Sequence, residues 1–145
     1  MNLINAVKVT RASNAVVAGV GTVNGSVIDM QDYEGVMFSV AFGAIVAGAA
    51  TSIKLQGGTL PDGSDMADLA GTGVTVADTE DNEVVLMDCY QPALRYIRPV
   101  VSRATQNSAI DCITASQYRP RTKPTAQDVT VSHTSFTQTP APGTP

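Results

Sequence analysis

The chain has 145 residues, enough for one domain with its own core, and only 15% of them are charged, against roughly 25% in soluble domains generally. The charges are segregated, because residues 12–94 hold eleven acidic side chains and one basic one, whereas residues 95–123 hold six basic side chains and one acidic one. An acidic chain with no tryptophan lacks the basic footprint and the stacking platforms of nucleic-acid-binding proteins, so we predict no nucleic-acid partner.

Short segments rich in β-branched residues predict strands in the first part of the chain. They are 6–12, 15–20, 26–30 and 52–57, and Gly, Asn or Ser residues bound them. The clearest strand is 36–42, where alternate residues are large and apolar. Its predicted buried face consists of Val36, Phe38, Val40 and Phe42.

The start of the chain and its longest apolar run indicate whether the protein is expected to be secreted or to enter a membrane. The first residues lack the basic region and the apolar run of a secretory signal, so we expect synthesis in the cytoplasm. The apolar run 36–50 has 15 residues, fewer than the roughly 20 that a membrane-spanning helix needs. We therefore predict no membrane partner.

Residues 57–83 predict a long polar connection rich in Gly and Asp. Asp62, Asp65 and Asp68 recur at every third position, but they lack the alternate-position carboxylates and the terminal Glu of a calcium-binding loop. We interpret the segment as a solvated acidic loop and predict no metal site. The best candidate for a helical turn is 64–70, where Ser64 or Asp65 is a suitable N-cap.

Three further strands are predicted between residues 83 and 118, joined as an antiparallel meander. The first, 83–90, has apolar residues in succession at 84–87, as expected of a strand buried on both faces. The second, 94–103, contains Pro99, which requires a sheet edge or a bulge because proline has no N–H to donate. Residues 105–108 predict a hairpin connection to the third strand, 109–118. The fold class predicted is all-β: a single antiparallel β-sandwich or barrel-like domain over residues 1–118.

Residues 119–145 predict an extended C-terminal arm. They contain five of the eight prolines and nine Ser or Thr residues, and no Asp, Glu, Lys or Arg follows Asp128. A segment rich in Thr, Val and Ser suits an extended strand laid along another surface, and a frayed terminus is the alternative. The candidate contact residues of the arm are Arg119, Arg121, Lys123 and Phe136, chosen for their charge or as its one large apolar group.

Arg95 and Arg98 are two further candidates for contact. Regions of opposite charge favour head-to-tail packing between like subunits, so the basic region 95–123 is predicted to meet the acidic region 12–94 of another copy. A solvated strand face is the alternative interpretation of Arg95, Arg98 and Arg103.

The sequence predicts neither an enzyme nor a cofactor. The single histidine, His133, lies in the predicted arm, which is a poor place for the ordered base of a Ser-His-Asp or Cys-His arrangement. Residues 19–24 begin like a dinucleotide-binding loop, but Asn24 stands where glycine or alanine is needed. Cys89 and Cys112 have no CxxC spacing. We expect reduced core cysteines, with a cross-strand disulfide as the alternative if their strands are neighbours.

Several segments, in order, resemble the small head decoration (cement) proteins of tailed bacteriophages. They are 32–40 (DYEGVMFSV), 68–72 (DLAGT), 86–92 (LMDCYQP), 94–98 (LRYIR) and 118–124 (YRPRTKP). The most specific is the Tyr-x-Pro-x-x-Arg-Tyr-x-Arg pattern of residues 90–98. The resemblance spans most of the chain and carries no catalytic motif with it.

This resemblance implies a β-rich, often trimeric protein that is made in the host bacterial cytoplasm and seats on the outer surface of the expanded capsid. There it would reinforce the shell against the pressure of packaged DNA. Its partners would be the major capsid protein and further copies of itself. Two alternatives stay open: a tail or head-tail junction component, and a carbohydrate-binding β-sandwich, for which no Trp and four Tyr are poor stacking material.

Overall fold

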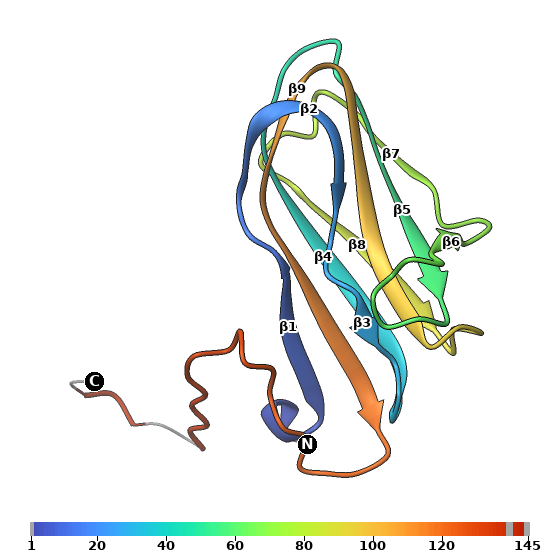
Figure 1. Ribbon diagram of the computed structural model, residues 1–145. Coiled ribbons are helices and arrows are strands. Elements are labelled where there is room, and N and C mark those ends of the chain that lie inside the picture. The colour runs from blue at the N-terminus through green and yellow to red at the C-terminus, as the bar shows by residue number, and fades with distance from the viewer. Residues whose placement is uncertain (1, 139–140, 144–145) are drawn as a thin grey trace.

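The computed structural model describes residues 2–138 and 141–143 and confirms the all-β fold (Figure 1). A short 3-10 helix, η1 (Leu3–Asn5), precedes the strands formed by the described residues. They are β1 (Val7–Ser13), β2 (Val16–Asn24), β3 (Ile28–Asp29), β4 (Tyr33–Ile45), β5 (Ala50–Gly58), β6 (Ala67–Asp68), β7 (Val74–Val76), β8 (Val84–Tyr90) and β9 (Tyr96–Pro120).

The long strand β9 organises the molecule because it bends and pairs with different strands on either side of the bend. Residues 96–104 pair with β5, and residues 108–120 pair with β4. In Figure 1 the first half rises in gold, bends at the top and returns in orange. The predicted connection at 105–108 coincides with this bend, where Thr105 has a φ of 69°. It does not form the predicted hairpin, since the two halves of β9 have different partners.

One antiparallel sheet therefore curls into two facing layers. The β8 layer consists of β8, β4, the second half of β9 and β1, in that order. The β5 layer has β6 and β7 along one edge, then β5, the first half of β9, and β2 followed by β3 along the other edge. Strand β2 spans both layers, pairing first with residues 108–110 and then with residues 100–103 of β9.

Alternating side chains from both layers fill the space between them. The apolar face predicted for β4 is confirmed, because Val36, Phe38, Val40 and Phe42 are at most 1% exposed. This face packs in one cluster with residues of β5 and β9, including Ile53, Leu55, Ile97, Val101, Ile110 and Ile113. The strands predicted at 6–12, 15–20, 26–30 and 52–57 are also present as β1, β2, β3 and β5.

The environment and pairing predicted for 83–90 are wrong. This strand, β8, is the outer strand of its layer and pairs with β4, so the predicted meander does not form. Val84 and Leu86 are 57% and 61% exposed, whereas Met87 is buried. A run of four apolar residues indicates a strand but does not establish that both faces are covered.

Pro99 lies in an inner strand, opposite Leu55 of β5, and not at a sheet edge. Its carbonyl accepts a hydrogen bond from the Gly25 backbone N–H at 2.8 Å. In an antiparallel ladder a residue's N–H and C=O point to the same side. The missing N–H of Pro99 thus faces residues 25–27, the interruption between β2 and β3, where no ladder bond is lost.

The connection between β5 and β8 packs back onto β5 and contains no helical turn at 64–70, contrary to the prediction. Residues 67–68 form β6 and residues 74–76 form β7, both paired with β5. Asp65 accepts hydrogen bonds from the Thr59 N–H and hydroxyl and from the Leu60 N–H. The carboxylate therefore fixes the turn after β5 instead of capping a helix.

Arg103 stabilises the bend of β9 from inside the fold. Its side chain is buried, and it donates hydrogen bonds to the carbonyls of Val17, Gly21 and Ser108 at 3.1, 3.3 and 2.8 Å. Beside it, the hydroxyls of Ser108 and Thr51 lie 2.9 Å apart. The sequence left two interpretations of Arg103 open: contact with another subunit, or a solvated strand face. The structure supports neither, because the side chain is buried within its own chain.

Candidate functional site

The outward side chains of the β8 layer form four cross-strand rows. Buried residues alternate with them along each strand, so the rows face away from the core. From β1 towards β8, three rows are Val7, Tyr118, Gly35 and Tyr90; Val9, Ser116, Met37 and Asp88; Arg11, Thr114, Ser39 and Leu86. The fourth is Cys112, Ala41 and Val84. We call these residues the outer face.

The outer face is nearly uncharged. Among its residues, all within the described part of the chain, Arg11 and Asp88 alone carry charge, and they lie on the opposite edge strands β1 and β8. Between them are hydroxyls, small apolar groups and the exposed side chains of Val84 and Leu86. Burying a hydroxyl costs far less free energy than burying an ion, so this surface can be covered by another protein at low desolvation cost.

A pair of stacked tyrosines occupies one end of the outer face. Gly35 pairs with Tyr118 on one side and with Tyr90 on the other. The two tyrosine rings stack above it, with centroids 6.5 Å apart and an angle of 6° between their planes. A Cβ at Gly35 would overlap the Tyr118 ring, so the glycine is what allows the two rings to approach across the strand.

Asp88 and Arg119 hold these tyrosines in place. The Tyr118 hydroxyl donates a hydrogen bond to the Asp88 carboxylate at 2.7 Å. Burial raises the pKa of Tyr118 to about 12, and the Asp88 carboxylate acts in the same direction because it favours the protonated hydroxyl. The guanidinium of Arg119 lies over the Tyr90 ring at 5.8 Å and pairs with Glu34 at 2.9 Å.

Three of the predicted contact residues lie around one end of the sandwich. Arg119 contacts Glu34, and Glu34, Arg95 and Arg121 line an open hollow of about 510 Å³. Arg95 forms two hydrogen bonds of 2.8 Å with Asp29. These bonds lower the pKa of Asp29 against the opposing effect of burial. Arg95 and Arg119 thus already pair with acidic side chains of their own chain.

The other three predicted contact residues lie apart. Arg98 donates to the Gln56 side-chain oxygen at 2.9 and 2.7 Å on the β5 layer. Lys123 is exposed beyond the end of β9, and Phe136 is 60% exposed near the end of the described chain. The six predicted residues therefore do not form one surface.

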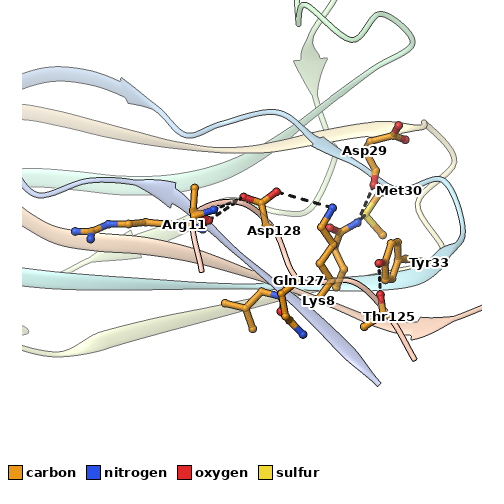
Figure 2. Close-up of polar contacts among 11 residues, drawn as sticks. Lys8, Arg11, Asp29, Met30, Tyr33, Thr125, Gln127 and Asp128 are labelled. Carbon is orange, nitrogen blue, oxygen red and sulfur yellow. Dashed lines mark hydrogen bonds and ion pairs between the residues drawn. The ribbon is translucent and has the colours of Figure 1, made fainter. Parts of the chain in front are cut away.

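Part of the predicted arm binds the chain's own β1, a contact that the sequence did not predict. We call residues 125–130 the C-terminal strap. Figure 2 shows Thr125 beside Tyr33, where their hydroxyls lie 2.5 Å apart, and Asp128 facing Lys8 at 3.9 Å. The Thr125 backbone N–H also donates to the Asn5 carbonyl at 3.0 Å.

Gln127 and Thr130 replace a neighbouring strand along the outer edge of β1. The amide nitrogen of Gln127 donates to the carbonyls of Ile4 and Val7 at 2.8 and 2.6 Å, and its oxygen accepts from the Val9 N–H at 2.9 Å. The Thr130 hydroxyl accepts from the Arg11 N–H at 2.9 Å. These side chains satisfy backbone groups that a sheet edge otherwise leaves to solvent.

Beyond the strap, residues 131–135 and the start of the chain enclose a mostly apolar groove. It has a volume of about 370 Å³, and its walls include Leu3, Ile4, Val7, Val9 and Val131. His133 lies on its rim and is exposed. The groove adjoins the outer face, because Val7 and Val9 belong to both.

The two cysteines are accounted for by their positions in the fold. Cys89 and Cys112 are free and partly buried, and they pair with Val36 and Ala41 at different heights on β4. That offset excludes the alternative of a disulfide between them. Burial raises the pKa of the Cys89 thiol, and the charge of Asp88 adds to this effect.

Within residues 2–138 and 141–143, no group of three or more His, Cys, Asp or Glu side chains is arranged to hold a metal ion. The three loop aspartates serve other contacts, because Asp62 accepts from Ser64, Asp65 from Thr59, and Asp68 from Lys54 and Gln56. No helix in this part of the chain is long and apolar enough to cross a membrane.

The sequence contained one usable signal for the outer face. In 36–42 Met37, Ser39 and Ala41 alternate with the core residues, but which strands would extend this surface sideways depends on pairing. Comparison with protein-family models and with characterised proteins finds no match for this chain. The fold and site define it as an all-β protein with a nearly uncharged outer sheet face.

Proposed function

We propose that this chain is a structural virion protein that binds the outer surface of an expanded bacteriophage capsid and stabilises the shell against the pressure of packaged DNA. Its partner in this proposal is the major capsid protein. The observation that carries the proposal is the outer face, because a nearly uncharged surface of hydroxyls and small apolar groups suits broad contact with another protein. The resemblance of residues 90–98 and 118–124 to head decoration proteins supports the choice of a capsid as that protein.

Binding several capsid subunits at once would give such a protein its mechanical effect. Packaged DNA pushes neighbouring subunits apart, and a ligand that contacts more than one of them opposes the separation with combined affinity. Residues 132–138, which are exposed and include Phe136 and no Asp, Glu, Lys or Arg, extend the contact surface beyond the domain. The strap fixes where this segment starts.

Co-sedimentation with expanded heads that lack the protein tests the proposal directly. We expect saturation near one bound copy per major capsid subunit, measured by gel densitometry. A trace ratio would instead favour a tail or head-tail junction component, whose copy number is far lower. Binding to a glycan array without binding to heads would favour the carbohydrate-binding alternative.

A matched pair of serine substitutions tests whether the outer face is the capsid-binding surface. Ser39 lies at the centre of the outer face, and Ser52 lies at a comparable outward position on β5, between Ser102 and Thr75. Ser39→Lys should abolish binding to heads, because it would bury an unpaired charge. Ser52→Lys should bind like the wild type. Equal binding by both variants, with equal thermal stability, would contradict this assignment.

A further inference from the structure

The edges of the curled sheet differ in how they are protected, and this difference indicates where a second chain can pair. Exposed edge strands offer unpaired N–H and C=O groups, and natural proteins usually cover, shorten or distort them. Each layer here has two edges: β1 and β8 for the β8 layer, and β2 with β3 and β6 with β7 for the β5 layer.

Three of these edges carry such protection. The strap covers β1 through Gln127 and Thr130. Strand β2 is interrupted by two register shifts and by Gly21, whose φ is 107°, and β3 has only two residues. The edge formed by β6 and β7 consists of strands of two and three residues.

Within the described residues strand β8 has none of these protections: β4 is its one paired strand, and Gly71, Thr72 and Val74 border a hollow beside it without hydrogen-bonding to it. Its seven residues pair with β4 without a register shift, and they include no proline or lysine. Two hydrogen bonds flank the strand, one from the Phe42 N–H to the Glu83 carbonyl and one from the Gln91 N–H to the Glu34 carbonyl. These bonds direct the backbone groups of odd-numbered residues towards β4, so Val84, Leu86, Asp88 and Tyr90 direct theirs towards the open edge.

The exposed side chains of β8 are those same even-numbered residues. Val84, Leu86 and Tyr90 are 57%, 61% and 50% exposed. A regular edge strand that presents both free backbone groups and apolar side chains is an established template for adding another strand.

We propose that two copies of this chain pair antiparallel through β8, with Leu86 of one copy opposite Leu86 of the second. This register places Val84 opposite Asp88 and keeps the two Asp88 carboxylates apart. It is a two-fold, self-complementary contact, the commonest symmetry of soluble homo-oligomers.

The charges at the two ends of β8 select the antiparallel arrangement. The loop before β8 carries Asp78, Glu80, Asp81 and Glu83, and the far end of the strand has Arg119 stacked over Tyr90. Parallel pairing would bring the two acidic loops together, whereas antiparallel pairing places each loop at the far end of the other copy's β8, where Arg119 pairs with Glu34. The inferred pair joins two β8 layers into one continuous sheet with a doubled outer face.

Sedimentation velocity across a concentration series, with no capsid present, measures this association. We expect the wild-type chain to pass from monomer to dimer, and Leu86→Lys to weaken dimerisation by at least about tenfold, equivalent to roughly 1.4 kcal/mol. Val17→Lys is the matched control, because Val17 is 86% exposed on the edge strand β2, and it should dimerise like the wild type. A wild-type chain that stays monomeric throughout, or a trimer that Leu86→Lys leaves unchanged, would overturn the pairing.

Cysteine cross-linking tests the register independently. In an antiparallel pair, opposed residues of a hydrogen-bonded site have Cα atoms about 5.5 Å apart, within the range that a disulfide spans. Leu86→Cys should therefore give a covalent dimer on mild oxidation that reductant reverses, whereas Val17→Cys should not. Cys89 and Cys112 are present in both variants, so any cross-linking through them contributes equally to both. Equal cross-linking of the two variants would contradict a contact centred on Leu86.

Discussion

At the scale of single residues, Gly35 and Tyr118 show how one missing side chain shapes the outer face. The Tyr118 ring covers Gly35, stacks on Tyr90 and places its hydroxyl against Asp88. The sequence segment 32–40 gave no reason to connect Gly35 with a tyrosine more than eighty residues later. Their proximity follows from the pairing of β4 with the second half of β9.

Gly35→Ala should lower the free energy of unfolding by about 1–2 kcal/mol, because the added Cβ displaces the Tyr118 ring from its stack and from Asp88. Urea denaturation measures the change. The same substitution in a Tyr118→Ala background should cost little, since the ring is already absent. Equal costs in the two backgrounds would show that Gly35 is required by the backbone and not by Tyr118.

Tyr118 also makes an alkaline pH dependence testable. Its pKa is raised from 10 to about 12 in the folded chain, so the unfolded state ionises first as the pH rises. Its contribution to stability is therefore complete below pH 10 and is lost as the pH rises through the interval up to about 12. Part of the wild-type loss of stability in that interval should be missing in Tyr118→Phe. The difference between their ultraviolet titrations should show a tyrosinate that forms near pH 12, and a transition near pH 10 would contradict the assignment.

At the scale of elements, β1 and β8 are the two edge strands of the β8 layer, and they differ in how their edges are covered. Side chains of the strap occupy the edge of β1, whereas the edge of β8 carries exposed apolar residues. Sequence patterns predicted both strands but not this difference. Coverage of an edge depends on where a segment more than a hundred residues away comes to lie.

Gln127 is the residue on which attachment of the strap depends. Gln127→Ala should lower the free energy of unfolding by about 0.5–1.5 kcal/mol and speed amide hydrogen exchange at Val9 and Arg11. Gln127→Glu should be worse, because a carboxylate cannot donate to the carbonyls of Ile4 and Val7. Gln138→Glu, in the exposed end of the chain, is the control and should change neither quantity. Unchanged exchange at Val9 in Gln127→Glu would mean that the strap is held elsewhere.

At the scale of the whole molecule, residues 125–138 of the predicted arm have two parts with different neighbours, whereas residues 119–120 belong to β9. Residues 125–130 complete the edge of β1, and residues 131–138 continue with mostly exposed side chains. Phe136 therefore remains a candidate contact with another molecule. The strap, in contrast, is part of the domain's own structure.

Two truncations separate these roles. A chain ending at residue 132 keeps the strap and should retain the stability and the oligomeric state of the full chain. A chain ending at residue 123 uncovers β1, so it should unfold at lower urea concentration and self-associate through the newly exposed edge. Urea denaturation and light scattering compare the two. Identical behaviour of the two truncated chains would show that the strap does not protect β1.

The sequence by itself determined the all-β class, the positions of β1 to β5 and the buried face of β4, because a period of two is a local property of the chain. It also determined the low charge from which the outer face is built. Only the tertiary structure decided that β8 is an outer strand, that β9 bends into both layers, that Arg103 is buried and that Gln127 covers β1. Each of these features depends on contacts between residues far apart in sequence, and alternation along one strand specifies its faces but not its neighbours.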